Sequence, residues 1–190
     1  MRATWLNTAT VCLSFVLIVF SCKKSNPPST PTNAVTGTYT FVNMNAQTQV
    51  TETEAGGITA VSVANYITQN NTGTIKFTVD SMAVTGVGYS VDTTVITSFY
   101  LNGTLYAADT TAFTAALPAT SATQTYTMVN SDSLYFPNGG IIPAGLTSSG
   151  AGQGARFVIN GDTLKLYTSG SDTTNGQVQS GLGIITLVKQ

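Results

Sequence analysis

Hydrophobic and polar residues alternate along most of the chain. In residues 74–80 (TIKFTVD), Ile75, Phe77 and Val79 fall on one side of an extended backbone, and residues 163–166 (TLKL) repeat the pattern. A period of two is typical of antiparallel strands that bury one face and expose the other. The alternation therefore predicts a folded part built of short β-strands.

Turn sequences separate the alternating segments. Asn102-Gly103 and Asn160-Gly161 each lie between two such segments. The Asn-Gly pair suits a type I′ hairpin turn, because both central residues of that turn need a positive φ. Two further alternating segments flank residues 130–133, which predicts a third hairpin there.

The spacing of the turns predicts about eight to ten strands, joined mostly to their neighbours in the chain. Residues 59–69 are counted among them because β-forming side chains dominate that segment. This favours an all-β, antiparallel up-and-down meander closed into a barrel, with a β-sandwich as the alternative. An immunoglobulin-like core is disfavoured, since Trp5 is the only tryptophan and the folded part has no cysteine pair. Gly86 and Gly88, two apart in one long strand, indicate a kink or a close approach of backbones.

The amino terminus follows a different pattern. Residues 11–20 (VCLSFVLIVF) are apolar apart from one serine. As a helix they would span about 15 Å, half of a hydrocarbon core of about 30 Å, so we interpret them as a secretory signal and not a membrane span. The signal ends in Val19-Phe20-Ser21-Cys22, which resembles the lipobox of bacterial lipoproteins. The resemblance implies cleavage between Ser21 and Cys22 and a diacylglycerol thioether on Cys22; the alternative is an ordinary secretory signal.

The chain then divides into three predicted parts. These are a signal peptide (1–21), a lipidated cysteine with a proline-rich tether (22–33), and a β domain (34–190). Two or three acyl chains, at about 0.8 kcal/mol per buried methylene, would hold such a protein firmly on a membrane. The SCKK start and the composition resemble lipoproteins of Bacteroidota. This implies a lipid-anchored protein of the cell envelope, in the outer membrane, with the periplasmic or surface face left open.

Charge and composition narrow the function classes. Charged residues are 8% of the 190-residue chain, the net charge is −1, and Lys23-Lys24 is the only basic cluster, so we expect no nucleic-acid partner. The chain has no histidine, and no cysteine follows Cys22, which removes the usual general base and any thiolate or zinc chemistry in the folded part.

Glu52 and Glu54 share a strand face, and we interpret them as solvent-facing charges. We predict no catalytic residue, metal site, cofactor or enzymatic activity; a hydrolase is the third-ranked alternative.

The opening Thr36-Gly37-Thr38-Tyr39 and the closing GDTLKLY hairpin resemble those of lipocalin-like domains. A barrel of about eight strands either fills its interior or holds one small ligand. We predict non-catalytic binding of a small apolar or amphipathic molecule, by four aromatic residues of the strands and three apolar residues of the loop at 137–154: Phe77, Phe99, Tyr106, Phe157, Ile141, Ile142 and Leu146. The alternative is a filled barrel with no ligand and a structural or protein-interaction role. The oligomeric state is left open.

Each of the six aspartates is followed by serine or threonine and then by methionine, leucine or threonine. The pattern resembles the acceptor sequence for O-glycosylation of secreted Bacteroidota proteins. The alternative is turn chemistry, because Asp and Thr side chains bind nearby backbone groups. The candidate acceptors are Ser81, Thr93, Thr110, Ser133, Thr163 and Thr173.

Overall fold

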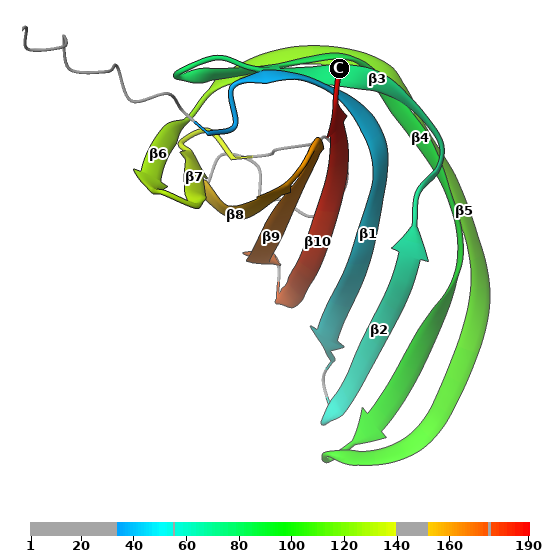
Figure 1. Ribbon diagram of the computed structural model, residues 1–190. Coiled ribbons are helices and arrows are strands. Elements are labelled where there is room, and N and C mark those ends of the chain that lie inside the picture. Colours follow the sequence, from blue (N-terminus) through cyan, green and yellow to red (C-terminus); the bar gives the residue numbers. More distant parts are fainter. Residues whose placement is uncertain (1–33, 55, 140–151, 175) are drawn as a thin grey trace, which may run out of the picture. The chain divides into compact units, whose positions relative to one another are not determined.

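The computed structural model describes residues 34–54, 56–139, 152–174 and 176–190. These ranges hold ten β-strands and no helix, and therefore no helix that could cross a membrane (Figure 1). The strands are β1 (Gly37–Thr53), β2 (Ile58–Ile67), β3 (Gln69–Phe77), β4 (Ser81–Leu101), β5 (Thr104–Thr125), β6 (Thr127–Asn130), β7 (Ser133–Phe136), β8 (Gln153–Asn160), β9 (Thr163–Thr174) and β10 (Gln177–Lys189). The predicted all-β class is confirmed, and so is the predicted number of strands.

All the strands pair antiparallel in one sheet. β5 pairs β4, and the sheet then continues through β3, β1, β10, β9, β8 and β7 to β6. Most partners are neighbours in the chain, which confirms the predicted meander. The main exception is the long ladder of β1 with β10, which joins the two ends of the described chain. No ladder between described residues links β5 to β6, so these pairings form an open, curved sheet and do not close it into a barrel.

β2 and β3 together occupy one place in the sheet, between β1 and β4. β2 pairs the second half of β1 and the end of β4, whereas β3 pairs the start of both strands. The two strands are therefore one long strand, interrupted at Thr68. The predicted strand over residues 59–69 is confirmed as far as Ile67, where β2 ends.

The turns follow the predicted chemistry with one correction. Asn102 and Gly103 have φ values of 49° and 81°, as a type I′ turn requires. At the second Asn-Gly pair, however, Asn160 is still in the ladder opposite Thr163. The turn residues are Gly161 and Asp162, and only Gly161 has a positive φ, 58°. That pattern is typical of a type II′ turn, so the type I′ prediction was wrong there. The third hairpin is confirmed by the pair Asn130–Ser133.

The glycine pair in β4 marks a bend. Gly86 has a φ of 60°, and a Cβ on Gly88 would lie 2.9 Å from the backbone nitrogen of Ala119. The ladders of β4 with β3 and with β5 both shift register beside these glycines. Both features predicted for Gly86 and Gly88, a kink and a close backbone approach, are present.

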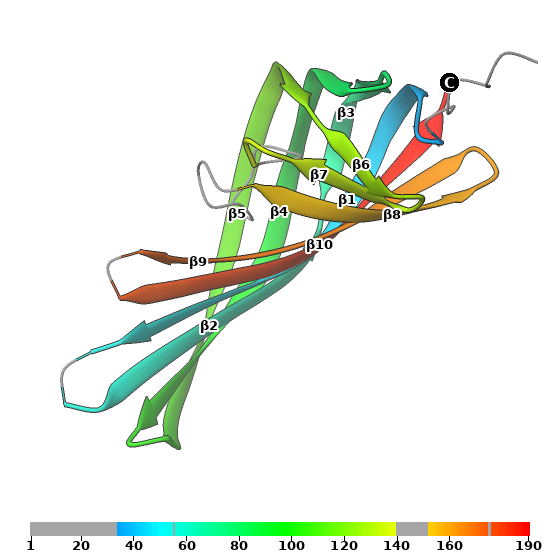
Figure 2. The same cartoon turned by 90° about the vertical axis from the view of Figure 1, so that its left-hand side faces the viewer.

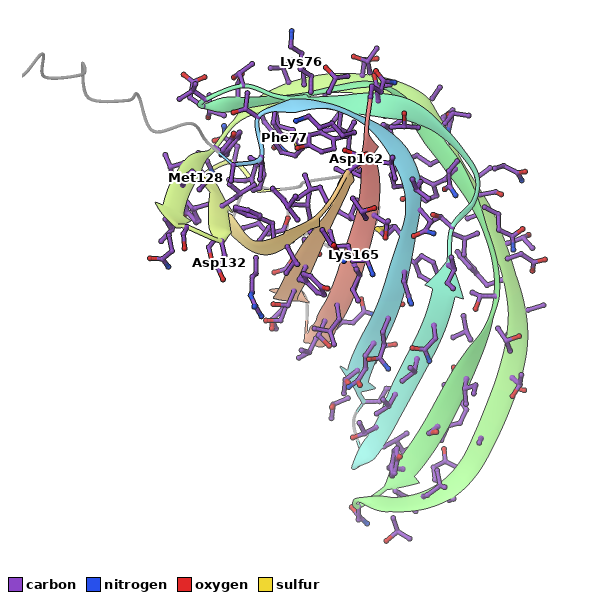
Figure 3. All side chains as sticks on the ribbon, in the orientation of Figure 1. Lys76, Phe77, Met128, Asp132, Asp162 and Lys165 are labelled. Atoms are coloured by element: carbon purple, nitrogen blue, oxygen red, sulfur yellow. The ribbon has the colours of Figure 1, made fainter. Side chains whose placement is uncertain are left out.

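The hydrophobic core lies between the β3–β4 end of the sheet and the strands β7 to β10. Four aromatic rings cross it in series, with centroid distances of 5.9 Å for Tyr39–Phe77, 5.9 Å for Phe77–Tyr126 and 5.7 Å for Tyr126–Phe136. The Tyr126 hydroxyl donates a hydrogen bond to the Thr78 carbonyl at 2.6 Å. In Figure 3, Phe77 points into this core and its neighbour Lys76 points away from it, as strand alternation requires. Tyr126 therefore connects the β6–β7 hairpin to the end of β3, through its ring contacts and this hydrogen bond, across a packed core.

Beyond the core the sheet continues as a single layer, which we call the arm. It contains the turn ends of the hairpins β1–β2, β4–β5 and β9–β10, which Figure 2 shows ending on the same side. Residues 104–116 of β5 are exposed throughout. Because no second layer covers the arm among the described residues, both of its faces are open to a ligand or partner.

Candidate functional site

A first hollow, the inner groove, lies on the core-facing side of the arm. It has a volume of about 410 Å³. Its lining comes from β1, β2, β4 and β5 and consists of Thr48, Val50, Ser62, Ala64, Tyr66, Tyr89, Val91, Val95, Phe113, Ala115, Ala116 and Leu117. Tyr89 and Val91 belong to the core, and Tyr66 and Leu117 pack against it. The groove is therefore an open extension of the core along the arm.

Cross-strand register explains why these residues meet. Thr48 lies opposite Ala64, and Ala64 lies opposite Val95 on the next strand. Val91 lies opposite Ala115 on β5. Small residues at positions 64 and 115 leave room on this face, while larger apolar side chains from the neighbouring positions form its walls. Alternation within each strand combined with this register produces a hollow, not a flat sheet.

The polar groups of the inner groove are hydroxyls. Ser62 Oγ and Thr97 Oγ1 share a hydrogen bond at 2.9 Å beside it. Burial raises the pKa of Tyr66. Burial, and then the proximity of Tyr66, raises the pKa of Tyr89 to about 12. Both phenols are therefore neutral at physiological pH, and no charged side chain of the described residues lines the groove.

A second hollow, the outer groove, lies on the opposite face of the sheet and has a volume of about 840 Å³. Asn45 and Gln47 line it from β1, whereas Thr48 and Val50 of the same strand line the inner groove. The full lining is Asn45, Gln47, Val129, Asn130, Ser133, Leu134, Tyr135, Gly154, Ala155, Arg156, Tyr167, Thr168, Ser169, Leu182, Gly183 and Ile184. It combines two tyrosines, three side-chain amides and one arginine.

The seven ligand residues predicted from the sequence do not form one site among the described residues. Phe77 is 1% exposed and Phe157 is buried as well, and both belong to the packed core. Phe99 and Tyr106 contact each other near the β4–β5 turn, with ring centroids 6.2 Å apart, and line neither groove. The three loop residues, Ile141, Ile142 and Leu146, lie outside the described residues.

The residues of the inner groove were not predicted, because the groove depends on the register of two hairpins and on the pairing of β2 with β4. Strand alternation puts Val91 and Val95 on one face of β4, and Phe113 and Ala115 on one face of β5. The turn at Asn102-Gly103 predicts that these two strands pair, but not the shift of their register between Phe99 and Tyr100, nor the pairing of β4 with β2. A small residue facing large ones across the ladder, as Ala115 faces Val91, was the only local signal of a hollow.

The other predicted residues are placed as follows. Ser21 and Cys22 lie outside the described residues, as does the predicted tether. Glu52 and Glu54 are exposed at the end of β1. No cluster of three or more His, Cys, Asp or Glu side chains that could hold a metal ion occurs in the described ranges.

The six candidate acceptors of the Asp-Ser/Thr pattern differ in their surroundings. Thr110 and Thr173 are exposed, and their backbone N–H groups donate to the preceding aspartate at 2.7 and 2.8 Å. The other four are half-buried: Ser81, Thr93, Ser133 and Thr163. Hydrogen bonds hold the Ser81 hydroxyl at 2.7 Å from Thr78 Oγ1, the Thr93 hydroxyl at 2.7 Å from the Asn65 carbonyl, and the Ser133 hydroxyl at 3.0 Å from Asp132 Oδ1. Of the six, Thr110 and Thr173 are therefore the most accessible.

No protein-family description, no curated protein and no solved structure matches this chain.

Proposed function

We propose that the protein is a lipid-anchored lipoprotein of the cell envelope that binds a small apolar or amphipathic molecule without catalysis. The observation that carries the proposal is the inner groove, whose lining is apolar apart from neutral hydroxyls. Its volume of about 410 Å³ is in the range of small-molecule sites. A charged ligand would lose its hydration there without finding a partner, whereas an acyl chain or a sterol-like body would bury apolar surface.

The hydroxyls give the groove an amphipathic character. Tyr66 and Tyr89 lie at the core end of the groove, Thr48 is on β1, and the Ser62 hydroxyl on β2 is bonded to Thr97 on β4. A ligand with one hydroxyl or ester group would be oriented by these residues while its apolar part covers Val95 and Phe113. A lipid anchor on Cys22 would keep this groove close to a membrane, which is the source of such molecules.

Native mass spectrometry of the mature protein, after exposure to an envelope lipid extract, tests the proposal. We expect a discrete added mass on the wild type. Ala115→Phe should remove it, because Ala115 is exposed in the groove and a phenyl ring there fills the hollow without entering the core. Gly154→Leu, on the opposite face, is the matched control and should keep the added mass. If the wild type shows only the bare mass in several extracts, or if Ala115→Phe binds as well as the wild type, the inner groove is not a ligand site.

The anchor is tested separately. Cys22→Ser should move the protein from the membrane fraction to the soluble fraction of its host and should remove the acyl mass from the intact protein. Retention of Cys22→Ser in the membrane fraction would argue against lipidation as the means of attachment.

A structural or interaction role is the second candidate, because the core is filled and β5 is an open edge strand. β5 has 22 residues, and within the described chain it pairs only β4. A long edge strand is a template for pairing with another chain. A photo-crosslinking residue in place of Ala112 on β5 should then capture an envelope protein in the native host, while one in place of Lys165 on β9 should not.

A further inference from the structure

We propose that the outer groove is a second binding site and that its ligand is a neutral saccharide. The proposal is independent of the inner groove, since the two hollows lie on opposite faces of the sheet and share no lining residue. It depends on the kind of side chains that the outer groove brings together, which differs from that of the inner groove.

A continuous row of side chains crosses five strands in the outer groove. Ser133 on β7 lies opposite Arg156 on β8, and Arg156 lies opposite Tyr167 on β9. Tyr167 lies opposite Ile184 on β10, and Ile184 lies opposite Asn45 on β1. With strands about 4.8 Å apart, the row is about 19 Å long. The groove can therefore hold an extended ligand lying across the strands.

Two tyrosine rings and two glycines meet on this face of the sheet. Tyr135 is 42% exposed and Tyr167 is 38% exposed. A Cβ on Gly152 would overlap the Tyr135 hydroxyl, so the Tyr135 phenol lies directly over the backbone of that glycine. Gly154 is opposite Tyr135 in the ladder, and a Cβ there would meet nothing within 4 Å. The result is a bare stretch of backbone beside two exposed aromatic rings.

Several polar side chains of the outer groove have donors and acceptors that are not used within the described chain. Within the described chain, the side-chain amides of Asn45, Gln47 and Asn130 have no hydrogen-bond partner in the protein. Each amide offers both donors and an acceptor. Arg156 Nε lies 3.2 Å from Asp132 Oδ2, and both side chains are well exposed. Asp132 is not itself a lining residue, but its carboxylate offsets the charge of Arg156, whose remaining N–H groups are donors in the groove.

This combination selects a neutral, hydroxyl-rich ligand with an apolar face. An anion would compete with Asp132 for the arginine, and a cation would find no free carboxylate among the described lining residues. A pyranose ring presents C–H groups that pack on an exposed aromatic ring, and its neighbouring hydroxyls match the donor and acceptor pair of an amide. The lining of the inner groove has neither amides nor an ion pair, so it lacks this capacity.

The experiment measures binding of maltohexaose, cellohexaose and mannohexaose to the mature protein, by calorimetry and saturation-transfer NMR. The detergent that holds the lipid anchor must have no sugar headgroup. We expect at least one of the three to bind and to show saturation transfer from tyrosine protons. Tyr167→Ala should weaken that binding about tenfold or more, while Tyr167→Phe, which keeps the ring, should change it by less than about threefold.

Gly154→Leu is the second test variant. The φ of Gly154 is not in the positive region, and a Cβ there would meet nothing within 4 Å. The fold should therefore tolerate leucine, whose side chain would occupy the groove. We expect Gly154→Leu to abolish saccharide binding with an unchanged circular dichroism spectrum. The matched control is Ala115→Phe on the opposite face, which should bind the saccharide as the wild type does. The inference is overturned if none of the three saccharides binds at millimolar concentration, or if Gly154→Leu binds like the wild type.

Discussion

Thr68 and Met44 form a reciprocal pair at the break between β2 and β3. The backbone N–H of Thr68 donates to the Met44 carbonyl at 2.9 Å, and the backbone N–H of Met44 donates to Thr68 Oγ1 at 2.8 Å. Thr68 is 3% exposed. Asn71 Nδ2 also donates to the Thr68 carbonyl at 3.0 Å. A side-chain hydroxyl therefore takes the place of a missing ladder carbonyl where the long strand is interrupted.

Thr68→Val tests this arrangement. Valine keeps the shape of threonine but offers no acceptor, so the buried N–H of Met44 is left without a partner, at a cost of about 1–3 kcal/mol. We expect urea unfolding to show that loss in the free energy of unfolding. Thr68→Ser is the control, because it keeps the hydroxyl and loses only a methyl group, worth about 1 kcal/mol. A Thr68→Val protein as stable as the wild type would show that the hydroxyl does not support the break.

Tyr126 provides the second prediction. Tyr126→Phe removes the hydroxyl that donates to the Thr78 carbonyl and should lower the free energy of unfolding by about 1 kcal/mol. Tyr126→Ala also removes the ring between Phe77 and Phe136 and should cost about 3–5 kcal/mol. Thermal unfolding measures both. Equal losses for the two variants would mean that the ring does not join the β6–β7 hairpin to β3.

Two glycines that face each other across β3 and β4 should respond differently to alanine. Gly73 has a φ of 95°, and its added Cβ would lie 2.5 Å from backbone atoms of Gly86. Gly86 has a φ of 60°, but a Cβ there would meet nothing within 4 Å. Gly86→Ala should therefore cost only the left-handed penalty of about 1–2 kcal/mol. Gly73→Ala should cost clearly more, because the strands must separate as well. Denaturant midpoints that rank the two variants in the opposite order would contradict this account of the bend.

Features of the fold that depend on neighbouring residues in the chain could be predicted from the sequence. The strand character of residues 74–80 follows from alternation, and the turn at Asn102-Gly103 follows from residue chemistry, so both were predictable. Gly86 and Gly88 were recognisable because a glycine inside a strand usually marks a bulge, a bend or a close approach of backbones. At Asn160 the same reasoning failed by one residue, because pairing with Thr163 kept Asn160 in the ladder.

The two grooves could not be foreseen in this way. Phe77 and Phe99 both sit in alternating segments, yet one lies in the core and the other on the arm. Their environments differ because other strands cover Phe77, and which strands these are is a matter of long-range pairing. The outer groove likewise depends on five strands that bring Asn45 and Ser133 to the two ends of one row. Register of this kind is specified by the whole sheet and not by any one segment.

The last prediction concerns pH. Burial, and then the proximity of Tyr66, raises the pKa of Tyr89 to about 12 in the folded protein, against about 10 for an unfolded tyrosine. Below about pH 10 the phenol is neutral in both states, and its effect on stability does not change with pH. Between about pH 10 and 12 the unfolded chain releases the proton first, so the free energy of unfolding should fall, by about 2 kcal/mol in all.

Urea unfolding at about pH 9 and about pH 11 measures the first part of this fall, and Tyr89→Phe is the comparison. The variant should lose less stability between the two pH values than the wild type does, because phenylalanine cannot ionise. Some decline should remain, since burial also raises the pKa of Tyr39 and Tyr66. If the wild type and Tyr89→Phe decline in parallel, Tyr89 ionises as it would in water, and the inner groove is wetter than its apolar lining indicates.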